Sequence, residues 1–275
     1  MRILKFLSIL PFILIIGSSQ ASEVLYFGDS HSTGTNLGAR ILRFLQNPSA
    51  NGCQSAASGE NDVLKLNGNG LDPRHWLSSS SGTRRFLYRA LEQRDEVSRA
   101  QEGQTPLQRL IVEQGQNPDR RLVMEFGDNS LGGNGPDTFT QNLERMIEQL
   151  GVSPENCIVV APQPNVKPEH RAAKDRILAS LREFRDQGKC NVVFYDESSG
   201  GRLPLTDGIH STPSGYNRWA DQATSGICSA NILRRTEVDS ISGCDECQNH
   251  SSTTPDIRNY IKSNNAKQVK TKPRN

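Results

Sequence analysis

The feature of this sequence that most constrains its fold is the alternation of short apolar runs with longer stretches of helical periodicity. Strands that alternate with helices form right-handed βαβ units, in which a parallel sheet is covered by helices on both faces. We therefore predict an α/β fold with three layers, α/β/α. The predicted strands are the apolar runs EVLYF (23–27), RLVMEF (121–126), CIVVAP (157–162) and NVVFYD (191–196).

The stretches between these runs repeat their apolar residues every three or four positions, as amphipathic helices do. Leu143, Ile147 and Leu150 share one helical face, and Gly151 follows them as a fitting C-terminal cap. Helices are predicted for residues 35–46, 83–98, 105–115, 136–150, 168–187 and 214–227.

Residues 47–82 are rich in Asn, Gly and Ser, and this composition predicts an irregular loop. A loop of this length inside a domain is typically functional or disordered. We consider its His75 and Trp76 a candidate wall of a substrate site. The alternative interpretation is that Trp76 pins the loop to the body of the domain.

The first 21 residues have the pattern of a secretory signal peptide. Arg2 and Lys5 precede an apolar core, and SQA at 19–21 is a small-x-small cleavage signal. The apolar stretch at 6–17 is shorter than the roughly 20 residues that a membrane-spanning helix needs. We therefore predict an exported protein, periplasmic or extracellular, with no stable membrane span.

Residues 22–228 are assigned to one folded domain, and residues 229–275 to a C-terminal extension. The chain without residues 1–21 has about 250 residues, which is enough for one domain with a substantial core. It then holds 30 Lys+Arg and 30 Asp+Glu, so no global field gathers polyanions and no nucleic-acid binding is expected. Residues 257–275 contain six basic residues and no acidic one, and their composition predicts disorder at the end of the chain.

All six cysteines follow the predicted signal peptide, and an even number of cysteines in an oxidising compartment predicts disulfides. Cys244 and Cys247 form a CxxC motif with His250 nearby, for which a zinc site is the alternative. A zinc knuckle needs further ligands, and the sequence has one CxxC, so we predict no metal site. The cysteines are Cys53, Cys157, Cys190, Cys228, Cys244 and Cys247.

Three polar motifs come after predicted strands. Ser30 in FGDS follows the first strand, Asn129 in GDN follows the second, and DGIH, with Asp207 and His210, lies beyond the last. Because sites in open parallel sheets form at the carboxyl ends of the strands, we expect these side chains at one edge of the sheet. A hydroxyl, an imidazole and a carboxylate that meet there have the parts of a nucleophilic triad, and an amide beside them can bind an oxyanion.

The DxxH spacing of Asp207 and His210 strengthens this interpretation. A turn that contains glycine lets the carboxylate reach the imidazole Nδ1–H while Nε2 faces outward. The chain has five histidines, so one that is paired with an aspartate in this position is informative. A surface loop before a helix explains the STPSG sequence that follows His210, but it does not explain the Asp–His pair.

These motifs resemble the blocks of the SGNH hydrolases, the GDSL-type esterase and lipase superfamily. FGDS at 27–30 is similar to the first block of the family, GDN at 127–129 to the third, and DGIH at 207–210 to the fifth. The resemblance spans residues 23 to about 226. It implies a flavodoxin-like α/β/α fold for the domain.

The resemblance also implies a role for each matching residue. Ser30 would be the nucleophile, His210 the base and Asp207 the acid that orients the base. The oxyanion hole would contain the Ser30 backbone N–H and the Asn129 side chain. His31 is a further candidate for substrate binding, with Trp76, although His31 could instead pack the turn.

Two positions depart from the family pattern. Ser130 stands where the third block usually has an aspartate. The glycine of the second block, whose backbone N–H completes the oxyanion hole, is assigned to Gly59. Gln54, Ser55 or another residue of this loop is the alternative for this donor.

The implied activity is hydrolysis of carboxylic esters through an acyl-enzyme, without a metal or an organic cofactor. The GDSH form at Ser30 resembles modules of bacterial polysaccharide O-acetyl hydrolases and transferases, so the predicted substrate is an O-acyl group on a carbohydrate or cell-envelope glycan. Three alternatives stay open: a polysaccharide O-acetyltransferase, a lipase or lysophospholipase, and a non-catalytic envelope-binding protein.

Overall fold

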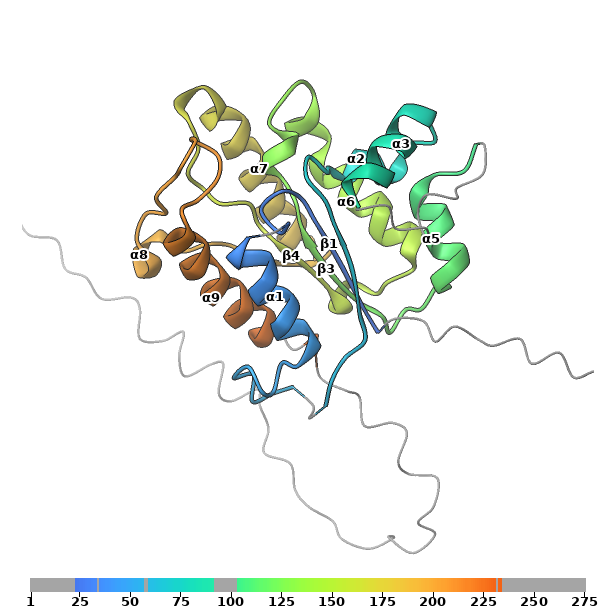
Figure 1. The fold of residues 1–275 in the computed structure, drawn as a ribbon, viewed down its shortest axis with the longest axis horizontal. Helices are drawn as coiled ribbons and strands as arrows, with labels where there is room; N and C mark the ends of the chain where they lie inside the picture. The colour runs from blue at the N-terminus through green and yellow to red at the C-terminus, as the bar shows by residue number, and fades with distance from the viewer. Residues whose placement is uncertain (1–22, 34, 57–58, 92–102, 231, 234–275) are drawn as a thin grey trace, which may run out of the picture. The chain divides into compact units, whose positions relative to one another are not determined.

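The computed structural model describes residues 23–33, 35–56, 59–91, 103–230 and 232–233 (Figure 1). The predicted signal peptide and the predicted basic end of the chain lie outside these residues, as do Cys244 and Cys247. Within the described part of the chain, no helix is both long enough and apolar enough to cross a membrane.

The centre of the fold is a five-stranded sheet in which every pair of neighbouring strands is parallel. The strand order is β2-β1-β3-β4-β5, which is the order of flavodoxin-like doubly wound folds. The predicted fold class is therefore confirmed. The strands are β1 (Val24–Gly28), β2 (Val63–Asn67), β3 (Arg121–Glu125), β4 (Cys157–Val160) and β5 (Asn191–Val193).

Helices cover both faces of this sheet, as the alternation of strands and helices predicts (Figure 1). Leu25 and Phe27 of β1 belong to the apolar cluster on one face, and Val24 and Tyr26 to the cluster on the other, because successive side chains of a strand point to opposite faces. The face of Val24 is covered by α1 (Asn36–Gln46) and α9 (Pro213–Ser229). The opposite face is covered by α2 (Pro73–Leu77), α3 (Ser81–Ala90), α5 (Pro106–Gln114), α6 (Gly135–Leu150) and α7 (Pro168–Asp186).

The ends of several helices follow directly from local sequence. Thr35 caps α1 by accepting a hydrogen bond from the Gly38 N–H. The first residue of α7 is Pro168, whose missing N–H is not needed in the first turn. Gly151 ends α6 at φ 67°, in the left-handed region that glycine adopts without strain.

The prediction of an irregular loop over residues 47–82 is wrong for its second half. This segment contains β2, α2 and the first two residues of α3. β2 has the sequence VLKLN at the edge of the sheet, and its five residues pair in register with β1. Pairing with a strand that is distant in sequence stabilises β2, and composition alone does not reveal such a contact.

Two disulfides support the prediction of cystine bridges for four of the six cysteines. Cys53 pairs with Cys228 and so joins the segment after α1 to α9. Cys157 pairs with Cys190 and joins the start of β4 to the residue before β5. Both pairs lie towards the edge of the sheet where its strands begin.

Candidate active site

Ser30 lies in a tight turn directly after β1, at the carboxyl edge of the sheet. The turn is fixed by hydrogen bonds from the Ser32 N–H and the Ser32 hydroxyl to the Asp29 carbonyl, at 3.2 and 2.9 Å. Gly28 makes this close turn possible, since a Cβ atom at this position would lie 1.9 Å from Ser32 Oγ. The Asp29 N–H donates to the Glu125 carbonyl at the end of β3, which continues the pairing of β1 and β3 into the turn.

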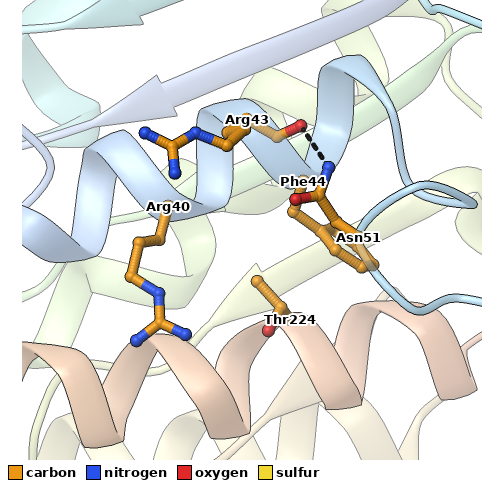
Figure 2. A pocket seen from close by; sticks show the side chains of 5 residues that line it. All are labelled: Arg40, Arg43, Phe44, Asn51 and Thr224. Carbon is orange, nitrogen blue, oxygen red and sulfur yellow. Dashed lines mark hydrogen bonds between the residues drawn. The ribbon is translucent and has the colours of Figure 1, made fainter.

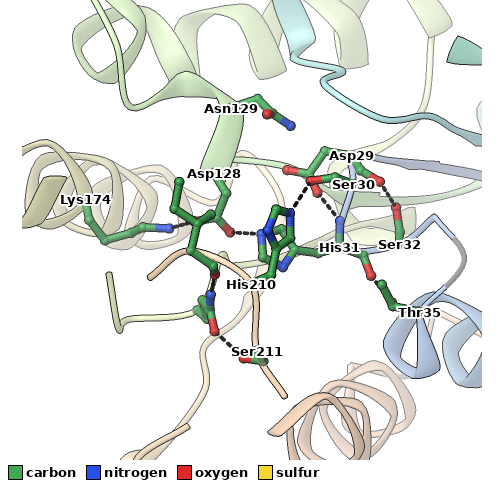
Figure 3. A network of polar contacts seen from close by, with 12 residues as sticks. Asp29, Ser30, His31, Ser32, Thr35, Asp128, Asn129, Lys174, His210 and Ser211 are labelled. Carbon is green, nitrogen blue, oxygen red and sulfur yellow. Dashed lines mark hydrogen bonds and ion pairs between the residues drawn. The ribbon is translucent and has the colours of Figure 1, made fainter. Parts of the chain in front are cut away.

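His210 reaches Ser30 from the segment between α8 (Glu197–Gly200) and α9. Its Nε2 lies 3.2 Å from Ser30 Oγ, although the two residues are 180 positions apart (Figure 3). Its Nδ1 lies 2.6 Å from Asp207 Oδ2. The structure therefore brings the hydroxyl, the imidazole and the carboxylate singled out in the sequence into one continuous chain of contacts.

The other oxygen of Asp207 organises the loop that carries His210. Asp207 Oδ1 accepts hydrogen bonds from the backbone N–H groups of His210 and Ile209, at 2.7 and 3.0 Å. These backbone donors, together with the His210 ring, hold the pKa of Asp207 well below its ordinary value. The carboxylate is therefore charged at neutral pH and can accept the Nδ1–H, which leaves Nε2 as an acceptor for the Ser30 proton.

Gln163 is a site residue that the sequence did not single out. It is buried after β4, and its Nε2 donates to the Ile209 carbonyl while its Oε1 accepts from the Ser211 hydroxyl. The two contacts flank His210 on both sides along the chain. An amide can donate and accept at once, so glutamine suits this place. Its position just beyond an apolar strand, in VVAPQP, is the signal that could have revealed it.

Asn129 lies in the short helix η1 (Asp128–Ser130) after β3. Its Nδ2 donates to the Leu71 carbonyl at 3.1 Å. A primary amide has two N–H donors, so this contact uses one of them. Ser130, the departure from the family pattern, donates to the Asp72 carboxylate and ties η1 to the N-terminus of α2.

The assignment of Gly59 to the oxyanion hole needs correction. Gly59 precedes β2, whose first residue, Val63, pairs with the first residue of β1. It therefore lies at the amino edge of the parallel sheet, whereas Ser30 lies at the carboxyl edge. The Asn61 N–H donates to the Gln46 carbonyl at the end of α1, which holds this segment at the amino edge.

The alternatives Gln54 and Ser55 share this problem, because they adjoin the Cys53–Cys228 disulfide. The segment after β2 is better placed for a backbone donor. In it, the Gly68 N–H donates to the Gly28 carbonyl at 3.1 Å, and Leu71 binds Asn129. Sequence reasoning missed this segment because it did not recognise β2.

Trp76 and His31, the predicted substrate-binding residues, are both fully buried in the structure. The Trp76 ring packs edge-on against Phe27, with ring centroids 4.7 Å apart, so it pins α2 to the sheet. His31 lies beneath His210, between α9 and η1. Neither side chain has the access to solvent that contact with a substrate requires, and the predicted role is corrected to packing for both.

His31 belongs to a buried polar cluster, which we call the His31 cluster and define as Asp29, His31, Asp128 and Lys174. His31 Nε2 lies 3.0 Å from Asp128 Oδ2, and the Lys174 ammonium contacts Asp128 Oδ1 (Figure 3). Burial opposes ionisation of Asp128, but Lys174 and His31 outweigh it and hold the pKa of Asp128 well below its ordinary value.

Burial prevails at Asp29 and Glu125, the acidic groups that interact with Asp128. Burial raises the pKa of Asp29 to about 6, with His31 acting in the opposite direction. Burial also raises the pKa of Glu125 well above its ordinary value, and the charges of Asp29 and Asp128 act in the same direction. For His31, burial favours the neutral ring, yet the Asp128 carboxylate outweighs it and raises the pKa of His31.

Clusters of metal ligands and surface hollows are the other features of the described residues that can form a binding site. No group of three His, Cys, Asp or Glu side chains among them is arranged to hold a metal ion. A polar hollow of about 170 Å³ lies between α1 and α9, lined by Arg40, Arg43, Phe44, Asn51 and Thr224 (Figure 2). Arg40 there is paired with Asp221, and the hollow contains none of the Ser30, His210 and Asp207 side chains.

The chain is similar to several solved structures. A member of the lipolytic protein G-D-S-L family from Veillonella parvula is 13% identical, with a TM-score of 0.46, and the match covers 74% of this chain and 96% of that one. An acetylxylan esterase from Geobacillus stearothermophilus is 14% identical, with a TM-score of 0.45 and coverage of 76% and 95%. The structure named TesA is 19% identical, with a TM-score of 0.45 and coverage of 75% and 98%. No protein-family model and no curated protein matches the sequence.

Proposed function

We propose that this protein is a serine esterase that hydrolyses carboxylic esters, with Ser30 as its nucleophile. One observation carries the proposal: Ser30 Oγ, the His210 ring and the Asp207 carboxylate form an unbroken chain of contacts of 3.2 and 2.6 Å. Nucleophile, base and orienting acid need this geometry and this order for acyl transfer. The motifs that resemble the SGNH hydrolases supply the same three residues.

In the proposed reaction, Ser30 Oγ attacks the ester carbonyl carbon while His210 Nε2 takes the hydroxyl proton. Asp207 stabilises the imidazolium that forms. The tetrahedral intermediate collapses with cleavage of the ester C–O bond, and the leaving alcohol takes its proton from His210. Water then attacks the acyl-enzyme, gives a proton to His210, and releases the acid as Ser30 regains its proton.

The developing oxyanion needs donors close to Ser30. We assign this role to the Ser30 backbone N–H, to the Asn129 amide and to a backbone N–H in residues 68–71. The contact between Asn129 and the Leu71 carbonyl supports this assignment, because it holds the amide donor against the segment after β2. Donors that are fixed in place before the reaction contribute most to catalysis.

The exposure of the site supports an ester carried on a large polar molecule. The side chains of His210 and Asp207 are 38% and 57% exposed, so the acyl group can be reached without deep insertion of the substrate. Among the described residues, the large apolar side chains at the surface are Phe86 and Val112, which make no broad lipid-binding surface. We therefore propose an O-acyl group, such as acetyl, on a carbohydrate or cell-envelope glycan.

Export to an oxidising compartment is part of the same proposal. The two disulfides support it, because such bonds persist mainly outside the cytosol. The amino-terminal sequence has the pattern of a signal peptide, which is consistent with this location.

The test is turnover of a chromogenic acetate ester by the purified protein and by Ser30→Ala. We expect the variant to lose about 10⁴-fold or more of kcat/KM, because no other group can form the acyl-enzyme. Ser49→Ala, in the segment after α1 at the opposite edge of the sheet, is the matched control and should retain full activity. Equal activity of wild type and Ser30→Ala over a range of acyl lengths would contradict the proposal.

A second experiment distinguishes a hydrolase from an acetyltransferase. It measures the release of acetate from acetylated glycans, with and without a sugar acceptor.

A further inference from the structure

We propose that His31 is a positioning residue for His210: a buried imidazole, held at both ring nitrogens, on which the ring of the proposed base rests. The inference deepens the proposed function, since it concerns the same site. It gives a chemical role to a residue that has no access to substrate.

The two rings are in contact through their faces. Their centroids are 4.9 Å apart and their planes are inclined by 30° (Figure 3). His31 also follows Ser30 directly in the chain, and its backbone N–H donates to Asp29 Oδ1 at 2.9 Å. One residue is therefore attached to the nucleophile by a peptide bond and to the base by ring packing.

The orientation of the His31 ring is fixed by its surroundings. Nδ1 lies 3.0 Å from the Tyr216 hydroxyl, and Nε2 lies 3.0 Å from Asp128 Oδ2. Tyr216 and Trp219 of α9 also pack against the ring, with centroids 5.8 and 5.6 Å away. Contacts at both nitrogens and packing on its edges fix the His31 ring in one orientation against His210.

Packing alone does not require such a cluster. Burying His31, Asp128 and Lys174 costs free energy of desolvation, and apolar replacements of buried ion pairs are often as stable or more stable. An apolar side chain could fill the same space beneath His210. What the ionisable cluster adds is a defined ring plane next to the proposed base.

Charged and titratable groups surround the His31 ring. The charged or titratable groups that face His31 are Asp29 of its own turn, Asp128 of η1, Lys174 of α7, Tyr216 of α9 and His210 itself. Asp128 favours the protonated form of His31. These groups come from its own turn, η1, α7 and α9, and together they fix the His31 ring beneath His210.

The first test removes one polar contact of the His31 ring and leaves the ring itself unchanged. Tyr216→Phe deletes the hydroxyl near Nδ1, and we expect kcat to fall about tenfold, with KM changed less than about twofold, because the loss concerns alignment of the base. Tyr195→Phe is the matched control. Tyr195 is a buried tyrosine on the same face of the sheet, and its hydroxyl donates to the Gly201 carbonyl at 2.8 Å, outside the His31 cluster. This control should keep kcat unchanged.

The second test is His31→Gln, which removes the ring. We expect kcat to fall about 100-fold with KM changed less than about twofold, because the proposed base loses the ring that aligns it. A residue that only packs would lower stability without lowering the kcat of the folded protein. If His31→Gln does not fold, Asp128→Asn, which removes the carboxylate beside His31 Nε2, is expected to lower kcat with KM changed as little.

A measurement without turnover separates this inference from the proposed function. The ring signals of His210 can be followed by NMR in the full chain, in wild type, Tyr216→Phe and Tyr195→Phe. We expect these signals to move in Tyr216→Phe only, because the His31 ring then loses one contact and changes its position against the His210 ring. If wild type has no esterase activity yet this change occurs, the proposed function fails and the inference holds. Unmoved His210 signals, or equal kcat in Tyr216→Phe and wild type, would overturn the inference.

Discussion

Two histidine–aspartate pairs lie at the carboxyl edge of the sheet with their imidazole rings in contact, and they differ mainly in access to solvent. In the inner pair, His31 and Asp128 have side chains that are 0% and 1% exposed, and the closest nitrogen and oxygen atoms are 3.0 Å apart. In the outer pair, His210 and Asp207 are 38% and 57% exposed, and the distance is 2.6 Å. The same two residue types thus occur once in the core and once at the surface.

The difference shows that environment, more than residue type, decides what such a pair can do. The pKa of the outer aspartate is lowered mainly by backbone N–H donors of its own loop, so the pair needs no further charge and stays open to substrate and water. The inner aspartate needs Lys174 to offset its burial. The outer pair can exchange protons with a substrate, whereas the inner pair can only hold and orient.

The largest expected effect comes from removing the outer imidazole. His210→Ala should lower kcat/KM by about 10⁴-fold or more, since the proton of Ser30 then has no acceptor. The free energy of unfolding should change by less than about 1 kcal/mol, because the pair is solvent-exposed. Steady-state kinetics and urea denaturation measure the two quantities. His170→Ala, in the first turn of α7, is the control and should leave kcat/KM unchanged, and retained activity of His210→Ala would contradict the assignment.

The second largest effect is expected at the inner pair, as a fall in the free energy of unfolding. Lys174→Met removes the cation beside Asp128 and leaves a buried carboxylate with His31 alone, so the free energy of unfolding should fall by about 3–5 kcal/mol. Lys189→Met, which breaks the exposed pair with Glu144, should leave the free energy of unfolding almost unchanged. Urea denaturation of both variants checks this difference. Equal losses would mean that burial does not distinguish the two ion pairs.

The outer pair could be predicted from the sequence, and the inner pair could not. Ser30 follows a strand with an unbroken apolar sequence, and the strand-end rule places His210 and Asp207 at the same edge. The partners of His31 come from η1, α7 and α9, which meet only in the folded chain. The sequence therefore left two roles open for His31, substrate binding and packing of the turn, and its buried partners became visible only in the structure.

The wrong assignment of Gly59 to the oxyanion hole arose because the fold prediction lacked strand β2. β1, β3 and β4 are covered on both faces, so their apolar runs stand out. β2 is an edge strand of sequence VLKLN, in a region rich in Gly and Asn, and it depends on pairing with β1. Because β2 was not predicted, residues 68–71 could not be assigned to the carboxyl edge of the sheet, where Ser30 lies. The predicted oxyanion donor was therefore a glycine at the amino edge.

The smallest expected effect is on the pH dependence of the free energy of unfolding, in which the buried Asp29 and the exposed Asp207 differ. In the folded protein Asp29 keeps its proton up to about pH 6, whereas its ordinary pKa is 3.8. Between these values the folded state binds more protons than the unfolded state, so this contribution to stability is full below about pH 4 and is lost as the pH rises to about 6. Asp207 has the opposite sign, because its pKa is lowered: its contribution is present above its ordinary pKa and is lost in more acidic solution.

Asp29→Asn removes the titrating group while its Oδ1 can still accept the His31 N–H. Urea denaturation between pH 4 and 6 should therefore show a shallower fall in the free energy of unfolding than in wild type, by up to about 3 kcal/mol across the range. Asp207→Asn should leave that part of the curve parallel to wild type, because the exposed carboxylate is already charged there. If the two variants change the curve alike between pH 4 and 6, burial does not separate the inner carboxylates from the outer one.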